Sequence, residues 1–136
     1  MAFIFICISI GVPIFLLYTR KKSWCSDKLR WAITTTLFLI GIFGYLIEKE
    51  RFSHNGCYFL FSPFIYNLFD RILKTISIKK YNRDFYLFLR NSDEIDDTMF
   101  TSNPHINWFD KLVSFLLLIL ILGLPFLFIL FFANAL

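Results

Sequence analysis

The sequence predicts an all-α integral membrane protein with four transmembrane helices, both termini outside, and a charged cytoplasmic loop between the third and fourth helices. Three observations favour this class. Hydrophobic residues make up 57% of the chain, whereas soluble domains have roughly 45 to 50%. Charged residues are crowded into three short polar stretches, and long apolar runs lie between these stretches. A bilayer imposes such segregation, because its core accepts apolar helices and excludes charge. We therefore interpret residues 1–136 as one transmembrane domain.

The first span is expected at residues 2–18. At about 1.5 Å per residue it reaches roughly 26 Å, close to the hydrocarbon thickness of about 30 Å. We interpret it as a retained span and not as a secretory signal, because no basic residue precedes it and Arg20 and Lys21 follow it. Cys7 and Gly11, one helical turn apart, form a small-residue stripe that suits contact with another helix.

Two short polar loops predict the orientation of the chain. The loop at 19–30 carries five basic residues against one acidic residue, Asp27. Short basic loops stay on the cytoplasmic side, so the amino terminus is expected outside. The loop at 48–56 carries two basic and two acidic residues. This neutrality is compatible with an external position.

The second span, expected at 31–47, has one helical face that carries small residues. Thr34, Gly41 and Gly44 recur on this face at helical spacing, together with Leu37. Small and hydroxyl-bearing side chains allow a second helix to approach closely. We predict that Thr34, Gly41 and Gly44 form a helix-packing surface.

The third span, expected at 57–73, includes charged residues. Its uncharged run ends at Phe69 and reaches only about 20 Å, so the helix has to continue through Asp70 and Lys74 to cross the bilayer. We expect Asp70 and Lys74 to pair at i,i+4 near the cytoplasmic end, where long basic side chains can extend to the head groups. A re-entrant or interfacial segment is the alternative.

The cytoplasmic loop, expected at 74–111, is divided by charge. Six basic residues against one acidic residue occupy 71–90, whereas five acidic residues and no basic residue occupy 91–110. Basic residues directly after a span favour the cytoplasmic face. The apolar run at 85–89 is too short to span and is expected in the interface or packed under the bundle. The candidate interaction residues of this loop are Arg71, Lys74, Lys79, Lys80, Arg83, Arg90, Asp93, Glu94, Asp96 and Asp97.

The fourth span is expected at 112–133, which carries no charged residue. Asn103 before Pro104 indicates a helix start ahead of this span, because proline is favoured at the first helical position. That helix would lead along the interface into the span. Trp108 would then lie at the depth of the head groups.

No catalytic, cofactor or metal site is predicted. His54 and His105 would lie on opposite sides of the membrane, and the three cysteines are scattered without ligand spacing. The acidic cluster at 93–97 could hold a divalent cation, but its spacing does not match an EF-hand. An acidic loop that is solvated or paired with the basic half is the favoured interpretation. The net charge of +4 does not indicate nucleic acid, because the basic residues adjoin apolar runs.

These features favour a non-catalytic, small polytopic membrane protein that acts as an accessory or assembly subunit. It would act through helix packing and its cytoplasmic loop, since no ionisable residue is expected deep in the spans. The expected partners are the lipid bilayer and another membrane protein or a second copy of the chain, and the expected location is a bacterial inner (cytoplasmic) membrane.

Three other functions are compatible with the same sequence. One is a membrane-resident immunity protein against a toxin, and another is a small oligomeric transporter or channel, which the missing intramembrane charge disfavours. The least favoured is an enzyme that acts on lipid through His105 with Asp96 or Asp97.

Overall fold

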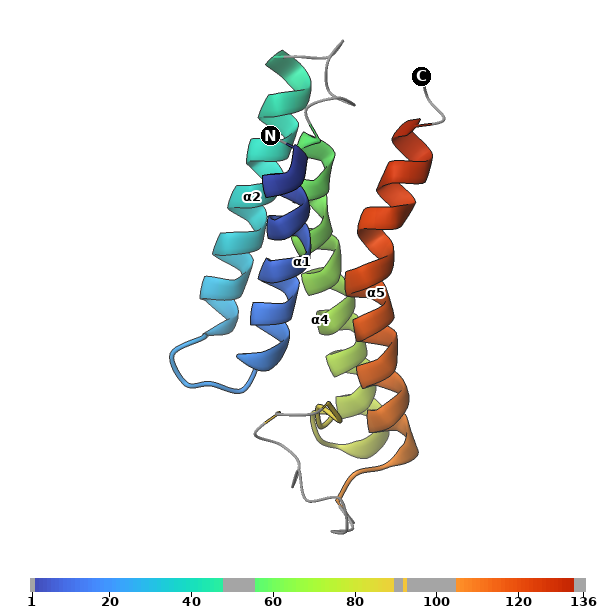
Figure 1. Cartoon of the computed structure of the whole chain (residues 1–136). Coiled ribbons are helices and arrows are strands. Elements are labelled where there is room, and N and C mark those ends of the chain that lie inside the picture. Colours follow the sequence, from blue (N-terminus) through green and yellow to red (C-terminus); the bar gives the residue numbers. More distant parts are fainter. Residues whose placement is uncertain (1, 48–55, 90–91, 93–104, 134–136) are drawn as a thin grey trace. The chain divides into compact units, whose positions relative to one another are not determined.

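The computed structural model describes four stretches of the chain, residues 2–47, 56–89, 92 and 105–133 (Figure 1). These residues form four α-helices and a short 3₁₀ helix, and they include no β-strand. The predicted all-helical class is confirmed. The chain divides into two compact units, which we describe separately, namely residues 1–68 with 120–136 and residues 69–119.

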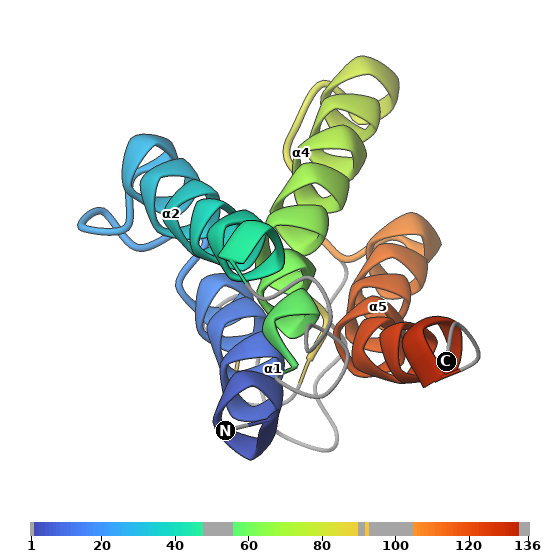
Figure 2. The same ribbon diagram turned by 90° about the horizontal axis from the view of Figure 1, so that it is seen from above.

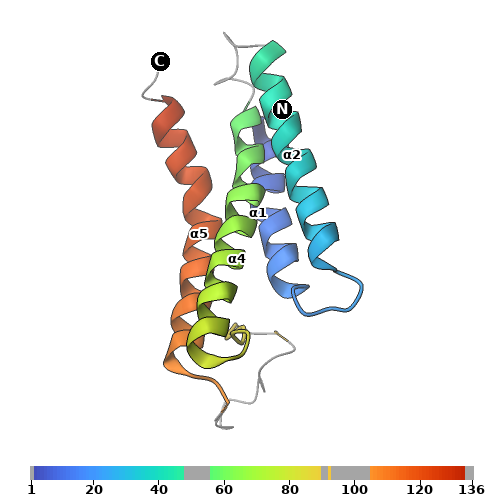
Figure 3. The ribbon, with the colours of Figure 1, turned by 180° about the vertical axis from the view of Figure 1, so that it is seen from behind.

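Helices α1 (Ala2–Tyr18) and α2 (Asp27–Ile47) are antiparallel neighbours in the first unit (Figures 1 and 3). Helix α1 has the bounds expected for the first span and continues through Pro13. The loop after α1 is attached to the end of that helix, because the Thr19 hydroxyl donates to the Phe15 carbonyl oxygen at 2.6 Å.

Helix α2 begins at Asp27, earlier than the start expected at Trp31. The cause is a cap, since the Ser26 hydroxyl accepts a hydrogen bond from the Leu29 N–H at 3.3 Å. The Asp27 carboxylate in the first turn also favours this start, because it interacts with the positive end of the helix dipole. As a consequence, Arg30 belongs to the helix and is buried, although the sequence placed it in the basic loop.

The 3₁₀ helix η2 (Cys57–Phe61) contacts both α1 and α2. It follows Gly56, whose φ of 72° lies in the left-handed region that glycine adopts without strain. Tyr58 and Phe59 of η2 are buried and form the centre of a hydrophobic core. The partly buried residues packed around them are Phe5, Ile6, Cys57, Phe61 and Phe128.

The small-residue face of α2 lies against η2 at Gly41 and Gly44 and against the next helix, α4 (Ser62–Tyr81), at Thr34. The ribbons of α2 and of the start of α4 lie side by side in Figure 2. A Cβ added at Gly41 would lie 2.7 Å from Cε1 of Phe61, and one added at Gly44 would lie 2.9 Å from the Cys57 Sγ. Hydrogen atoms at these two positions therefore allow η2 to approach α2 closely.

Two polar contacts accompany this packing in the first unit. The buried Thr34 hydroxyl accepts a hydrogen bond from Nδ2 of Asn67 at 3.4 Å. The buried Ser62 hydroxyl donates to the carbonyl oxygen of Ser9 at 3.2 Å. Both bonds join helices that are distant in sequence and satisfy polar groups that packing removes from solvent.

Helix α4 continues past the expected boundary at residue 73 to Tyr81, so the loop expected at 74–111 is helical at its beginning. Asp70 lies in the interior of α4 and is only 2% exposed. The sequence placed Asp70 near the cytoplasmic end of the span with Lys74 as its expected partner. In the structure the Lys74 Nζ lies 4.0 Å from Oδ2 of Asp84.

Among the described residues, two helices are long and apolar enough to cross a membrane, judged by length and composition. They are α2 and α5 (Trp108–Ala133), the latter over Trp108–Phe131. Helix α1 is apolar but shorter, and α4 carries several charged residues. Helix α5 begins before residue 112, so the expected loop is helical at its end as well.

Gly41→Ala is expected to lower the free energy of unfolding by about 1–3 kcal/mol, the usual cost of overpacking. The added Cβ would meet the Phe61 ring at 2.7 Å and the Cys57 carbonyl oxygen at 3.2 Å. Gly11→Ala is the matched control, because a Cβ there meets no atom within 4 Å and alanine favours a helix by about 1 kcal/mol. Thermal unfolding in detergent measures both, and equal melting temperatures would contradict the packing described for Gly41.

Candidate functional site

The polar site of the second unit begins where α4 ends. Asn82 has a φ of 56°, the left-handed conformation that commonly terminates a helix, and its N–H donates to the Ile78 carbonyl oxygen at 2.9 Å. The buried Ser77 hydroxyl donates to the Arg83 carbonyl oxygen at 3.0 Å. These bonds reverse the chain direction and hold the backbone of Arg83 against the last turns of α4.

Residues 84–88 after Arg83 belong to no helix, and their alternating burial indicates an extended segment. The side chains of Phe85 and Leu87 are buried, whereas Tyr86 and Phe88 between and after them are more exposed. This alternation is typical of an extended strand with one packed side. The apolar run that we expected in the interface or under the bundle therefore packs one of its two sides within the second unit.

Helix α5 begins with one side-chain cap bond, in which Oδ2 of Asp110 accepts the N–H of Asn107 at 2.8 Å. The N–H of Lys111 donates to the Asn107 carbonyl oxygen at 3.3 Å, which is a backbone bond of the first helical turn. The helix start expected from Asn103 and Pro104 is wrong, because residues 105–107 are not helical and the cap falls at Asn107. Asn103 and Pro104 themselves lie outside the described residues.

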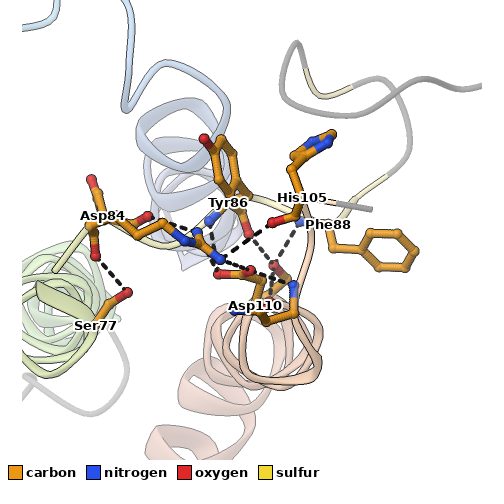
Figure 4. A network of polar contacts seen from close by, with 9 residues as sticks. Ser77, Asp84, Tyr86, Phe88, His105 and Asp110 are labelled. Carbon is orange, nitrogen blue, oxygen red and sulfur yellow. Dashed lines mark hydrogen bonds and ion pairs between the residues drawn. The ribbon is translucent and has the colours of Figure 1, made fainter. Parts of the chain in front are cut away.

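The Asp110 carboxylate is the centre of the site (Figure 4). Nη2 of Arg83 donates to Oδ2 at 2.8 Å and Nη1 to Oδ1 at 3.4 Å. The Tyr86 N–H donates to Oδ1 at 3.1 Å. Together with the Asn107 N–H, these donors occupy both oxygens of a side chain that is 2% exposed.

The same hydrogen bonds determine the ionisation of Asp110, which precedes the apolar run of α5. Burial alone would raise the pKa of this carboxyl group. The hydrogen bonds and the nearby Arg83 charge outweigh burial and hold the pKa below its ordinary value. The group is therefore a carboxylate at neutral pH.

A second residue of α5, Ser114, continues the contact one turn further. Its hydroxyl accepts the Phe88 N–H at 2.8 Å and donates to the Asp110 carbonyl oxygen at 2.7 Å. Asp110 and Ser114, spaced i,i+4, therefore bind the backbone of Tyr86 and Phe88 from one face of α5. We call Arg83, Tyr86, Phe88, Asp110 and Ser114 the loop-base network.

Aromatic and cationic side chains surround the loop-base network. The Tyr81 and Phe109 rings lie 5.2 Å apart between their centroids, and Lys80 Nζ lies over both rings. The Lys111 Nζ lies 5.0 Å from the centroid of the Phe88 ring. These contacts join the end of α4, the extended segment and the start of α5.

The structure positions the predicted site residues unequally. Thr34, Gly41 and Gly44 face η2 and α4, whereas Cys7 and Gly11 are exposed on α1.

Among the predicted loop residues, Arg71, Lys79 and Lys80 are exposed. Lys74 is near Asp84, and Arg83 belongs to the loop-base network. The rest lie outside the described residues, namely Arg90, Asp93, Glu94, Asp96 and Asp97.

Asp110 and Ser114 were not predicted as site residues. Two signals could have indicated them, namely the capping spacing between Asn107 and Asp110 and the i,i+4 spacing between Asp110 and Ser114. Neither signal identifies Arg83 as the partner, because that contact joins residues 27 positions apart.

The described part of the chain offers little for cofactor or metal chemistry. It contains no group of three or more His, Cys, Asp or Glu residues that could hold a metal ion. His105 is exposed, and its ring packs edge-on against the Tyr86 ring at 5.0 Å between centroids. Asp96 and Asp97, its partners in the hypothesis of a lipid-modifying enzyme, lie outside the described residues.

Comparison of the chain with protein-family models, with curated proteins and with solved structures finds no match.

A double-mutant cycle of Arg83→Gln and Asp110→Asn is expected to give a coupling energy of about 1–3 kcal/mol, because a hydrogen bond between charged groups is stronger than a neutral one and the Asp110 side chain is only 2% exposed. The matched cycle is Lys74→Gln with Asp84→Asn, a 4.0 Å pair whose side chains are 28% and 27% exposed. Such a pair contributes less than about 1 kcal/mol. Equilibrium unfolding in mixed micelles measures both cycles, and similar coupling energies would contradict a central role for Asp110.

Proposed function

We propose that the chain is a multi-pass membrane protein with four spans, both termini outside, in a bacterial cytoplasmic membrane. In this proposal it is a non-catalytic accessory or assembly subunit of a larger membrane complex. It binds a transmembrane helix of its partner at α1 and α2, and the loop-base network holds the ends of its cytoplasmic loop.

Exposure of the apolar helices supports membrane residence. Only 17% of the apolar window of α2 and 33% of that of α5 is buried, whereas a core helix of a soluble protein is mostly buried. Large apolar side chains remain exposed on three helices, among them Phe3 at 76%, Leu46 at 69% and Phe131 at 71%. Soluble monomers rarely expose apolar surface on this scale, and a bilayer would cover it.

Reporter fusions test the proposed topology. Alkaline phosphatase, which is active only outside the cytoplasm, is expected to be inactive when fused after Lys22 or Lys80 and active when fused at Leu136. A fluorescent reporter that folds only inside should give the opposite pattern. If 57–73 does not cross, the fusion after Lys80 becomes active and the fusion at Leu136 becomes inactive, which contradicts four spans.

The observation that carries the partner proposal is an apolar groove between α1 and α2 in the first unit. The groove has a volume of about 490 Å³ and is lined by Ile8, Val12, Ala32, Ile33, Thr36 and Leu37. Gly11, on the same helix as Ile8 and Val12, has open space where a Cβ would be. Small residues beside an open groove favour close approach of a helix more than filling by a flexible lipid chain.

Crosslinking from Cys7 tests this groove, because Cys7 is exposed one turn before Gly11 whereas Cys25 is buried. In a Cys57→Ser background, which removes the partly exposed third cysteine, a photoactivatable crosslinker on Cys7 in native membranes is expected to give one discrete adduct with a span of another membrane protein. Gly11→Leu, which fills the open space, should reduce the adduct on the order of tenfold. Cys7→Ala should give no adduct.

Gly123→Leu is the matched control, because a Cβ added at Gly123 on α5 would also meet no atom within 4 Å. It makes the same change of side chain away from the groove and should leave the adduct unchanged. Equal loss in both variants, adducts only with lipid, or adducts only with a second copy of the chain would each contradict the accessory-subunit proposal.

A further inference from the structure

We infer that the basic and aromatic edge of the second unit binds the phosphate headgroups of anionic phospholipids. The edge comprises Lys79, Lys80 and Lys111 together with Tyr81, Trp108 and Phe109. This inference rests on the membrane residence proposed above and adds a selective ligand to it.

The cations of this edge are presented outward. Lys79, Lys80 and Lys111 are all exposed. The Lys74–Asp84 and Arg83–Asp110 ion pairs of the second unit do not involve these three lysines. Their ammonium groups can therefore donate to an external anion without breaking such a described pair.

Aromatic side chains of the edge restrict the position of one of its ammonium groups. Lys80 Nζ lies 5.4 Å from the centroid of the Tyr81 ring and 6.0 Å from that of the Phe109 ring, so two rings restrict one ammonium group. Trp108, adjacent in sequence, is 75% exposed. Amphipathic rings of this kind are enriched at the depth of the lipid head groups.

Among the residues that the structure describes, the acids near this edge do not neutralise it. Asp110 is enclosed by the loop-base network and 2% exposed, and Asp84 lies near Lys74. The exposed ammonium groups of Lys79, Lys80 and Lys111, with that of Lys80 over two rings, match a layer of phosphate anions, because an anionic membrane surface attracts basic residues. An anionic lipid satisfies both parts of the edge, with its phosphate on the lysines and its glycerol and acyl region on the rings.

Fluorescence quenching in vesicles measures this selectivity on the full-length chain. A Trp24→Phe, Trp31→Phe background leaves Trp108 as the single tryptophan. Vesicles of dioleoylphosphatidylcholine then receive increasing amounts of brominated phosphatidylglycerol or brominated phosphatidylcholine. Trp108 is expected to report an association constant for phosphatidylglycerol about fivefold or more above that for phosphatidylcholine.

Lys79→Gln with Lys80→Gln should bring this ratio close to one. Lys21→Gln with Lys22→Gln, an equal charge change in the first basic loop, should leave it nearly unchanged. Equal association constants for phosphatidylglycerol and phosphatidylcholine in the chain with an unmodified edge would overturn the inference. Equal losses in both variants would also overturn it, because overall charge and not this edge would then cause the preference.

A second measurement omits the tryptophan substitutions and so controls for a folding defect that they cause. Native mass spectrometry of the otherwise unmodified chain with added phosphatidylglycerol should show fewer bound lipids for Lys79→Gln with Lys80→Gln than for the Lys21 and Lys22 variant. Unchanged lipid binding in a chain whose reporter fusions establish four spans would refute the lipid site alone. A chain that does not insert at all would refute the proposed function.

Discussion

A buried polar group needs a hydrogen-bond partner, and this constraint organises both units of the chain. In the second unit the buried Asp110 carboxylate accepts hydrogen bonds from two nitrogens of Arg83 and from the N–H groups of Tyr86 and Asn107. The position of the extended segment, the start of α5 and the orientation of Arg83 all depend on these bonds. In the first unit the hydroxyl of Thr34 and the amide of Asn67 satisfy each other between α2 and α4.

Hydropathy and helical spacing predicted the helices well where a helix is apolar along its whole length. The bounds of α1 agree with the expected span at 2–18. The starts of α2 and α5 lay outside their apolar runs, because caps at Ser26 and Asn107 determine them. Both caps have sequence signatures, so finer reading of the polar residues before each run would have found them.

The loop-base network was beyond prediction from one sequence. Charge segregation indicated that the basic half of the loop was important, and Arg83 was among the residues named. Its partner was not, because the i to i+27 contact with Asp110 requires the chain reversal at Asn82 and the packing of Phe85 and Leu87. The spacing of residues along one helix predicts which side chains are neighbours on that helix. It does not predict a contact between segments that are distant in the sequence.

The loop-base network also has a consequence for protein engineering. Hydrogen bonds to Ser114 and Asp110 of α5 hold the N–H groups of Phe88 and Asn107, which precede and follow the rest of the loop. An inserted domain whose ends lie close together would therefore add length between two fixed anchors, at an entropic cost that grows only slowly with loop length. An affinity tag or a fluorescent protein inserted between Ser92 and His105 accordingly leaves the hydrogen bonds of both anchors in place.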